Sequence, residues 1–123
     1  MSVEELYEMF PNLAERRRSQ GTRLSGGEQQ MLAMARILRT GANVLLLDEI
    51  TEGLAPVIVD KLGEVLIALK TRGYTVVLVE QNFRFAAPLA DRHFVMDHGK
   101  IVATVNHDEL ESKQHIFDEY LSV

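Results

Sequence analysis

Two short stretches of this sequence carry residue types that could bind phosphate or metal. The first, LSGGEQQ from Leu24 to Gln30, places two glycines in the first turn of a predicted amphipathic helix that ends near Arg39. Glycine is roughly 1 kcal/mol less favourable than alanine inside a helix, so stability alone does not favour this pair. Without side chains, however, the first-turn N–H groups could approach a phosphate closely at the positive end of the helix dipole.

A simpler interpretation of the same stretch is a capping box. Ser25 with Glu28 three residues later matches the pattern S-x-x-E, in which each side chain bonds a backbone amide at the helix start. This interpretation explains Ser25 and Glu28 but leaves Gly26 and Gly27 unexplained. From the residues alone, both interpretations stay open.

The second stretch is the acidic pair Asp48 and Glu49, which follows the apolar run 44–47. Adjacent carboxylates are costly to bury unless they are paired or bound to a metal. One of them could therefore hold Mg²⁺ while the other orients a water molecule. The alternative is that both carboxylates lie in a solvated loop, because an acid after an apolar run is common.

The elements that must position these residues alternate along the chain. The order strand, helix, strand, helix predicts an α/β domain with a mostly parallel sheet, and ligands bind at the carboxyl ends of the strands in such sheets. Polar clusters follow both predicted strands, so we expect them to meet at one edge with the LSGGEQQ turn. Strands are predicted at 44–47, which is apolar on both faces, and at 75–79. Helices are predicted at about 3–10, 26–39, 56–72, 83–89 and 108–121, with a polar connector before the second helix. A hairpin is predicted from 93 to 105, with its turn at His98–Gly99.

Composition excludes several classes of protein. The 123 residues, 46% hydrophobic and 25% charged, are typical of one soluble globular domain. The absence of cysteine excludes disulfides and thiolate metal sites. A net charge of -5 argues against a nucleic-acid-binding face, and the cluster Arg16–Arg18 is interpreted as solvated. No apolar run is long enough to span a membrane, and the N-terminus does not resemble a signal peptide.

Taken together, the motifs resemble those of a known family. LSGGEQQ, followed about fifteen residues later by VLLLDE, resembles the signature motif and the Walker B strand of ABC-type ATPases. The stretches LLLDEITEGLAP and VEQN are similar in particular to the ATP-binding subunits of branched-chain amino acid transporters and their urea or amide relatives. The resemblance covers residues 21–123.

The resemblance implies a role for each matching residue. In this family the signature residues meet the γ-phosphate of ATP held by the opposite subunit, an Asp holds Mg²⁺ through water, a Glu polarises the attacking water, and a switch residue contacts the γ-phosphate. Gln81 stands where most members have His, and Ile50 stands where the usual continuation is Pro, which is expected to alter the following turn. The implied sites are Ser25, Gly26, Gly27 and Glu28 for ATP, Asp48 for magnesium, Glu49 and Gln81 for catalysis, and Thr51, Glu52, Gly53, Leu54 and Ala55 for communication between subunits.

The implied fold is α/β and partial. It comprises a RecA-like P-loop NTPase core, with a mostly parallel sheet, flanking helices and a C-terminal β-hairpin, plus part of the ABC helical subdomain. Residues 1–40 are assigned to the helical subdomain and 41–123 to the C-terminal part of the core, together a single partial domain. The 123 residues contain no G-x-x-x-x-G-K-[ST] loop, so the P-loop strand is expected to be absent. Strands 75–79 and 93–96 would then face a gap and either pair with each other or self-associate.

The function favoured by the resemblance is that of a fragment of an ABC importer ATPase, which energises uptake of branched-chain amino acids or related small solutes. Its cofactors are ATP and Mg²⁺, but without a P-loop the chain is expected to be inactive alone. The implied partners are a second ATPase subunit and transmembrane permease subunits. The implied location is cytoplasmic, at the inner face of the plasma membrane. The chain is expected neither to bind nucleic acid nor to insert into the membrane. Two alternatives are a non-catalytic module that docks on an intact ABC ATPase and a head fragment of a DNA-repair or chromosome ATPase, although such heads carry long heptad flanks that this chain lacks.

Overall fold

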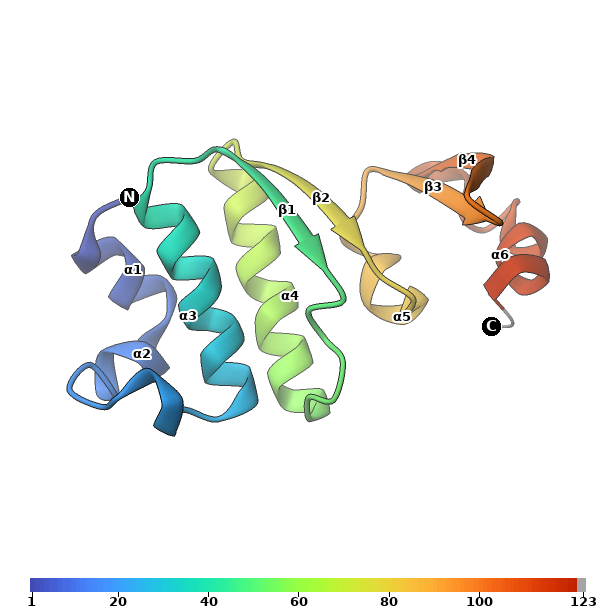
Figure 1. Ribbon diagram of the computed structural model, residues 1–123. Helices are drawn as coiled ribbons and strands as arrows, with labels where there is room; N and C mark the ends of the chain where they lie inside the picture. The colour runs from blue at the N-terminus through green and yellow to red at the C-terminus, as the bar shows by residue number, and fades with distance from the viewer. Residues whose placement is uncertain (122–123) are drawn as a thin grey trace. The chain divides into compact units, whose positions relative to one another are not determined.

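The computed structural model describes residues 1–121, apart from the side chain of Thr22. It divides into two compact units: unit 1 is Met1–Val79, and unit 2 begins at Glu80. The elements of each unit are labelled in Figure 1. The assignment of residues 1–40 and 41–123 to two subdomains stays a prediction.

Unit 1 consists of helices and a small parallel sheet. The predicted helices at 3–10, 26–39 and 56–72 and both strands are confirmed to within a residue or so. One helix was not predicted, because the segment after Phe10 was interpreted as a polar connector. Pro11 occupies the first turn of that helix, where its missing N–H costs nothing. The elements are α1 (Val3–Met9), α2 (Pro11–Glu15), η1 (Gly21–Arg23), α3 (Gly26–Arg39), β1 (Val44–Asp48), α4 (Pro56–Thr71) and β2 (Thr75–Val79).

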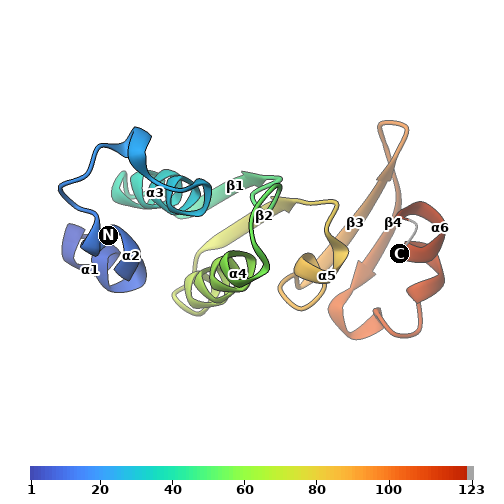
Figure 2. The same cartoon turned by 90° about the horizontal axis from the view of Figure 1, so that it is seen from below.

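The sheet of unit 1 is covered on one face only. β1 and β2 pair in parallel, from Val44 opposite Thr75 to Asp48 opposite Val79. Burial alternates along β1, so that Leu45 is 1% exposed whereas Leu46 is 74% exposed. The prediction that this strand is buried on both faces is therefore wrong for the described chain. A parallel strand is buried on both sides only where helices cover both faces, and Figure 2 shows α4 on one side of the pair.

The core of unit 1 lies between the helices and the covered face of the sheet. The apolar stripe predicted on α4 is confirmed, because its aliphatic side chains pack inward at helical spacing. The most deeply buried side chains of this core come from α3, β1, α4 and the junction between α1 and α2: Phe10, Met31, Leu38, Leu45, Leu62 and Leu69.

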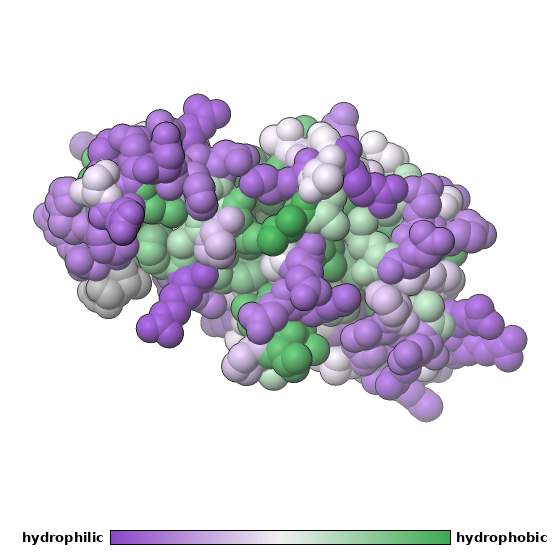
Figure 3. Space-filling model, turned by 180° about the vertical axis from the view of Figure 1, so that it is seen from behind, coloured by the Kyte–Doolittle hydropathy of each residue, from purple (hydrophilic) through white to green (hydrophobic). Residues whose placement is uncertain are grey.

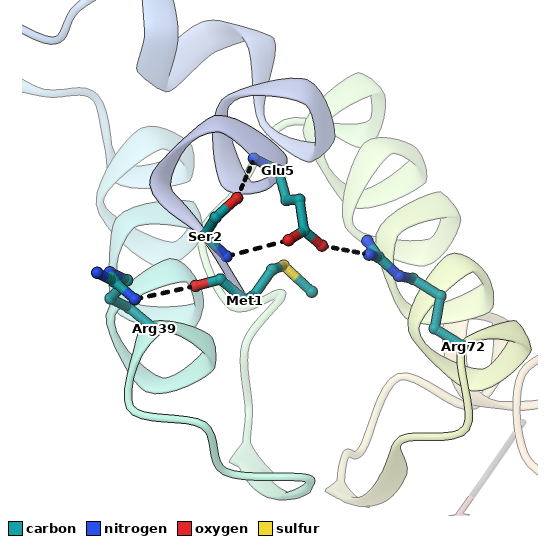
Figure 4. A network of polar contacts seen from close by, with 5 residues as sticks. All are labelled: Met1, Ser2, Glu5, Arg39 and Arg72. Carbon is teal, nitrogen blue, oxygen red and sulfur yellow. Dashed lines mark hydrogen bonds and ion pairs between the residues drawn. The ribbon is translucent and has the colours of Figure 1, made fainter.

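Polar contacts fasten the N-terminal helix to the ends of α3 and α4 (Figure 4). Ser2 and Glu5 form a capping box, in which the Ser2 hydroxyl accepts from the Glu5 amide at 3.1 Å. Glu5 Oε2 also lies 2.7 Å from Arg72 Nη2, and Arg39 donates to the carbonyl of Met1 at 3.4 Å. The bond from the Ser2 amide, followed by the Arg72 contact, lowers the pKa of Glu5.

Unit 2 is built on the predicted hairpin, which is confirmed. β3 and β4 are antiparallel, with a register shift between Val95 and Met96. His98 and Gly99 both have positive φ, 50° and 76°, as a two-residue hairpin turn of type I′ requires. The elements are α5 (Phe83–Ala86), β3 (Arg92–Asp97), β4 (Lys100–Asn106), η2 (His107–Glu109) and α6 (Gln114–Leu121).

Two helices of unit 2 are shorter than predicted. The helix expected at 83–89 ends at Ala86, because Pro88 has no N–H and its ring clashes with a preceding carbonyl. The helix expected from Asp108 begins only at Gln114. Glu109 closes the preceding turn by accepting from the Asn106 amide at 3.1 Å, so η2 forms as a separate short turn.

The core of unit 2 is aromatic on one side. Phe83 and Phe117 stack with ring centroids 4.3 Å apart, and the ring of His93 lies 5.7 Å from that of Phe117. In the described residues, the buried Nε2 of His93 has no hydrogen-bond partner. Burial, and then the nearby His107, lower the pKa of His93, while a bond to the Ala87 backbone acts in the opposite direction.

Each sheet in the described chain has two strands, β1 with β2 and β3 with β4. The pairing of β2 with β3 and self-association both stay predictions. Apolar side chains interrupt the hydrophilic surface, as the green areas in Figure 3 show for one face. Among residues 1–121, no helix has the length and apolar character needed to cross a membrane.

Candidate nucleotide-contacting site

The first turn of α3 forms the predicted capping box. The Ser25 hydroxyl accepts from the Glu28 amide at 3.2 Å, and Glu28 Oε1 accepts from the Ser25 amide at 3.0 Å. The bond from the Ser25 amide, the largest cause, lowers the pKa of Glu28. Neither side chain of the box bonds the amides of Gly26 and Gly27. The capping interpretation is therefore confirmed for Ser25 and Glu28, and it still leaves the glycines to be explained.

The two glycines differ in their surroundings. A Cβ placed on Gly27 would lie 2.4 Å from Cγ2 of Ile58, a distance that no real contact allows. A Cβ on Gly26 would meet only the end of the Leu54 side chain, at 3.3 Å, and Gly26 itself is exposed. Gly27 is thus required by the packing of α3 on α4, while Gly26 faces solvent.

The acidic pair lies at the carboxyl end of β1. Asp48 is exposed and Glu49 is partly buried. Glu49 adopts φ 52°, the left-handed region that few non-glycine residues enter, and its amide donates to the carbonyl of Val79 at 2.8 Å. The following Ile50 is 5% exposed, so it anchors the turn in the core where proline was the expected residue.

The loop from Thr51 to Ala55 connects this end of β1 to α4. Thr51 is buried, and its carbonyl accepts from the Leu54 amide at 3.2 Å, which closes a tight turn. Gly53, with φ 73°, supplies the left-handed residue in that turn. Glu52 and Ala55 are exposed. The loop thus begins two residues after Glu49 and reaches the first turn of α3 through Leu54.

The third polar cluster belongs to unit 2. Asn82 caps α5, because its side-chain Oδ1 accepts a hydrogen bond from the backbone amide of Phe85 at 3.2 Å. The backbone N–H of Asn82 donates to Oε1 of Glu80, also at 3.2 Å. Gln81 between them is exposed. The structure describes this cluster by itself, and its meeting with Asp48 and Glu49 stays a prediction.

The donor set can be tested against a magnesium ion. In the described part of the chain, no three His, Cys, Asp or Glu side chains gather in a group that could hold a metal. Mg²⁺ does not need such a group, because it is usually held by one or two carboxylates together with water and substrate phosphates. The exposed carboxylate of Asp48 fits that mode of binding.

One packing residue of this site was missed in the sequence. Ile58 was assigned only to the apolar stripe of α4, and its contact with Gly27 joins residues far apart along the chain. The only sequence signal was the glycine itself, which the capping box left unexplained. A glycine that no cap, turn or ligand requires indicates a close approach by another element.

Comparison with known proteins finds similarity to ATP-binding proteins of ABC transporters. The family model described as ABC transporter matches residues 2–52. The chain is 41% identical to the high-affinity branched-chain amino acid transport ATP-binding protein BraG of Pseudomonas aeruginosa, over 98% of this chain and 52% of BraG. It is 39% identical to the probable branched-chain amino acid transport ATP-binding protein LivF of Archaeoglobus fulgidus, over 88% of this chain and 46% of LivF. The chain spans about half the length of the curated relatives it matches.

Solved structures agree on the fold. A nucleotide-free ATP-binding cassette from an ABC transporter superposes with a TM-score of 0.84 at 21% identity, over 97% of this chain and 47% of that one. An ATP-binding cassette of an ABC transporter in its ADP conformation superposes with a TM-score of 0.77 at 22% identity, over 98% of this chain and 50% of that one. The predicted α/β class is confirmed, with a small parallel sheet and a C-terminal antiparallel hairpin.

Proposed function

We propose that this chain, which is similar to transport ATP-binding proteins over about half of their length, supplies the signature turn and the acidic strand end of an ATPase that energises uptake of branched-chain amino acids or related small solutes. The observation that carries the proposal is the joint occurrence, in unit 1, of the exposed LSGGEQQ turn and the Asp48–Glu49 pair, which the Thr51–Ala55 loop links. The names of BraG and LivF support the solute class.

The proposed roles follow from the position and the chemistry of each residue. Ser25, Gly26, Gly27 and Glu28 form a turn at the positive end of a 14-residue helix, which favours contact with a phosphate of ATP bound to an opposing subunit. Asp48 would hold Mg²⁺ through water. The ion, when bound, neutralises charge on the phosphates during transfer.

Glu49 is proposed to orient the attacking water and to accept its proton. A water-positioning group must be held in one place. Three features fix the backbone of Glu49: its left-handed conformation, the hydrogen bond from its backbone N–H to the Val79 carbonyl, and the buried side chain of the next residue, Ile50. Gln81 is proposed as the switch residue that contacts the γ-phosphate. Its amide hydrogen-bonds without titrating near neutral pH, in contrast to histidine.

The proposed partners are a second ATPase subunit and transmembrane permease subunits, which would hold the protein at the cytoplasmic side of a membrane. The Thr51–Ala55 loop is proposed to communicate between subunits. Solute choice is assigned to those other subunits.

The test restores a P-loop by joining this chain to the part of BraG that it does not match, hereafter the BraG chimaera. We expect the chimaera to release phosphate from Mg-ATP. The 123-residue chain alone should release none, and about 2 mM Mg-ATP should shift its melting temperature by less than about 1 °C. A folded chimaera that binds Mg-ATP without hydrolysing it would contradict the proposal and favour a non-catalytic docking module.

A further inference from the structure

The signature turn rests on a single side chain of the neighbouring helix. Three atoms of Ile58 would lie within 3.4 Å of a Cβ on Gly27, including Cγ2 at 2.4 Å and the branched Cβ itself. Ile58 is at the third position of α4, where the Ile58 and Val59 amides both donate to the carbonyl of Ala55. A β-branched side chain in a helix has one strongly preferred χ1 rotamer, so Ile58 cannot swing away to admit a methyl group.

The neighbouring contact is different in kind. Gly26 approaches only the terminal Cδ2 of Leu54, at a distance that a small rotation of leucine relieves. The two contacts have one origin, however, because Leu54 lies in the loop that follows Glu49 and Ile58 lies in the first turn after that loop. Any displacement of this loop would therefore reach the signature turn through Ile58.

We propose that Ile58 is a positioning residue, which sets the place of the Ser25–Glu28 turn relative to the Asp48–Glu49 end of β1, and that Gly27 is glycine because Ile58 occupies the space of its side chain. The proposal rests on the proposed ATPase function. It assigns the second glycine of the motif a packing role within its own chain, in addition to the phosphate contact proposed for the Ser25–Glu28 turn.

The contact itself is tested in the 123-residue chain by thermal unfolding of a double-mutant cycle. We expect Gly27→Ala to lower the melting temperature by about 5 °C or more, as overpacking does, and Ile58→Ala to lower it through lost packing. The double variant should lose clearly less than the sum of the two shifts, because the new methyl group fills the space that Ile58 vacates. Gly26→Ala is the matched control and should shift the melting temperature by no more than about 2 °C. Additive shifts would overturn the proposed contact.

The positioning role is tested in the BraG chimaera by the ATP concentration that gives half-maximal hydrolysis. We expect Ile58→Ala to raise this concentration by about tenfold in a protein that is still folded at the assay temperature, as misplacing a binding group does. Ile58→Val keeps both γ-carbons and should stay near the wild-type value. An active chimaera that tolerates Ile58→Ala unchanged would overturn the positioning role alone. An inactive wild-type chimaera would contradict the proposed function instead.

Discussion

Within residues 1–121, each unit of this protein contains one non-glycine residue in the left-handed region, Glu49 in unit 1 and His98 in unit 2, with φ of 52° and 50°. At His98 the conformation has a local cause, because a type I′ hairpin turn requires positive φ at both of its central residues. Glu49 follows a parallel strand and closes no hairpin. The hairpin turn thus explains the left-handed conformation of His98, whereas local structure does not explain that of Glu49. A functional role is proposed for Glu49.

The largest expected effect separates the two residues by activity. In the BraG chimaera we expect Glu49→Gln to lower ATP hydrolysis by about 100-fold or more, because the amide cannot accept a proton from water. His98→Gln should leave the rate within about twofold. Steady-state phosphate release measures both, and ATP binding by the Glu49 variant should persist. Near-normal ATP hydrolysis by the Glu49→Gln variant would contradict a catalytic role for Glu49 and leave it no different from His98.

The next prediction extends the comparison to helix caps, since Ser2 and Ser25 form the same S-x-x-E box. Either serine changed to alanine should lower the free energy of unfolding by about 1 kcal/mol, as the loss of an N-cap does. Only Ser25→Ala should also weaken ATP-dependent pairing of the chimaera, measured by analytical ultracentrifugation. If pairing is equal in the two variants, Ser25 is only a cap.

A stability measurement isolates the backbone strain itself. Gly and Ala variants at one position lose the same side-chain contacts, so their difference reports the left-handed conformation. At both residue 49 and residue 98 we expect the Gly variant to be more stable than the Ala variant by about 0.5–1 kcal/mol in urea unfolding. Ala33 on α3 is exposed and should show the opposite order when changed to Gly. A more stable Ala variant at residue 49 would contradict the strain.

The smallest expected effect is a loss of stability at low pH. It should be confined to unit 2, because all four histidines follow residue 80. The folded pKa of buried His93 lies below its ordinary value of 6.5. The unfolded chain therefore binds the proton more readily, so this contribution to stability is complete above pH 6.5 and is lost as the pH falls from there toward the folded pKa. Amide exchange should accelerate in α6 at pH 5.5 while α3 is unchanged.

His93→Phe should abolish this acceleration, because phenylalanine keeps an aromatic ring beside Phe117 and cannot be protonated. His98→Gln, at an exposed histidine on the hairpin turn, is the matched control and should keep the acceleration. Equal acceleration in His93→Phe and in the wild-type chain would show that another group causes the effect.

Much of the fold was predictable, because its signals are local. Ser25 and Glu28 begin α3, Pro56 opens α4, and His98–Gly99 turns the hairpin, each through atoms within a few residues of one another. The residues of the candidate site were named from two local motifs and from the resemblance to ABC-type ATPases. The short helix at Pro11 and the early end of α5 at Ala86 were missed, because proline signals both the start and the end of a helix.

The sequence alone determined most of the elements, the cap at Ser25 and the chemical types at the candidate site, since these depend on propensities and bonds within one turn or one strand. Only the tertiary structure decided three further features: the left-handed backbone of Glu49, the exposure of Leu46, and the contact that makes Gly27 necessary. Each of these features depends on how the helices and strands pack against one another. The packing of α3 on α4 brings together residues that are far apart along the chain, and no local sequence pattern predicts such a contact. Close packing makes such contacts specific to within a methyl group, which explains why one isoleucine accounts for a glycine in a distant motif.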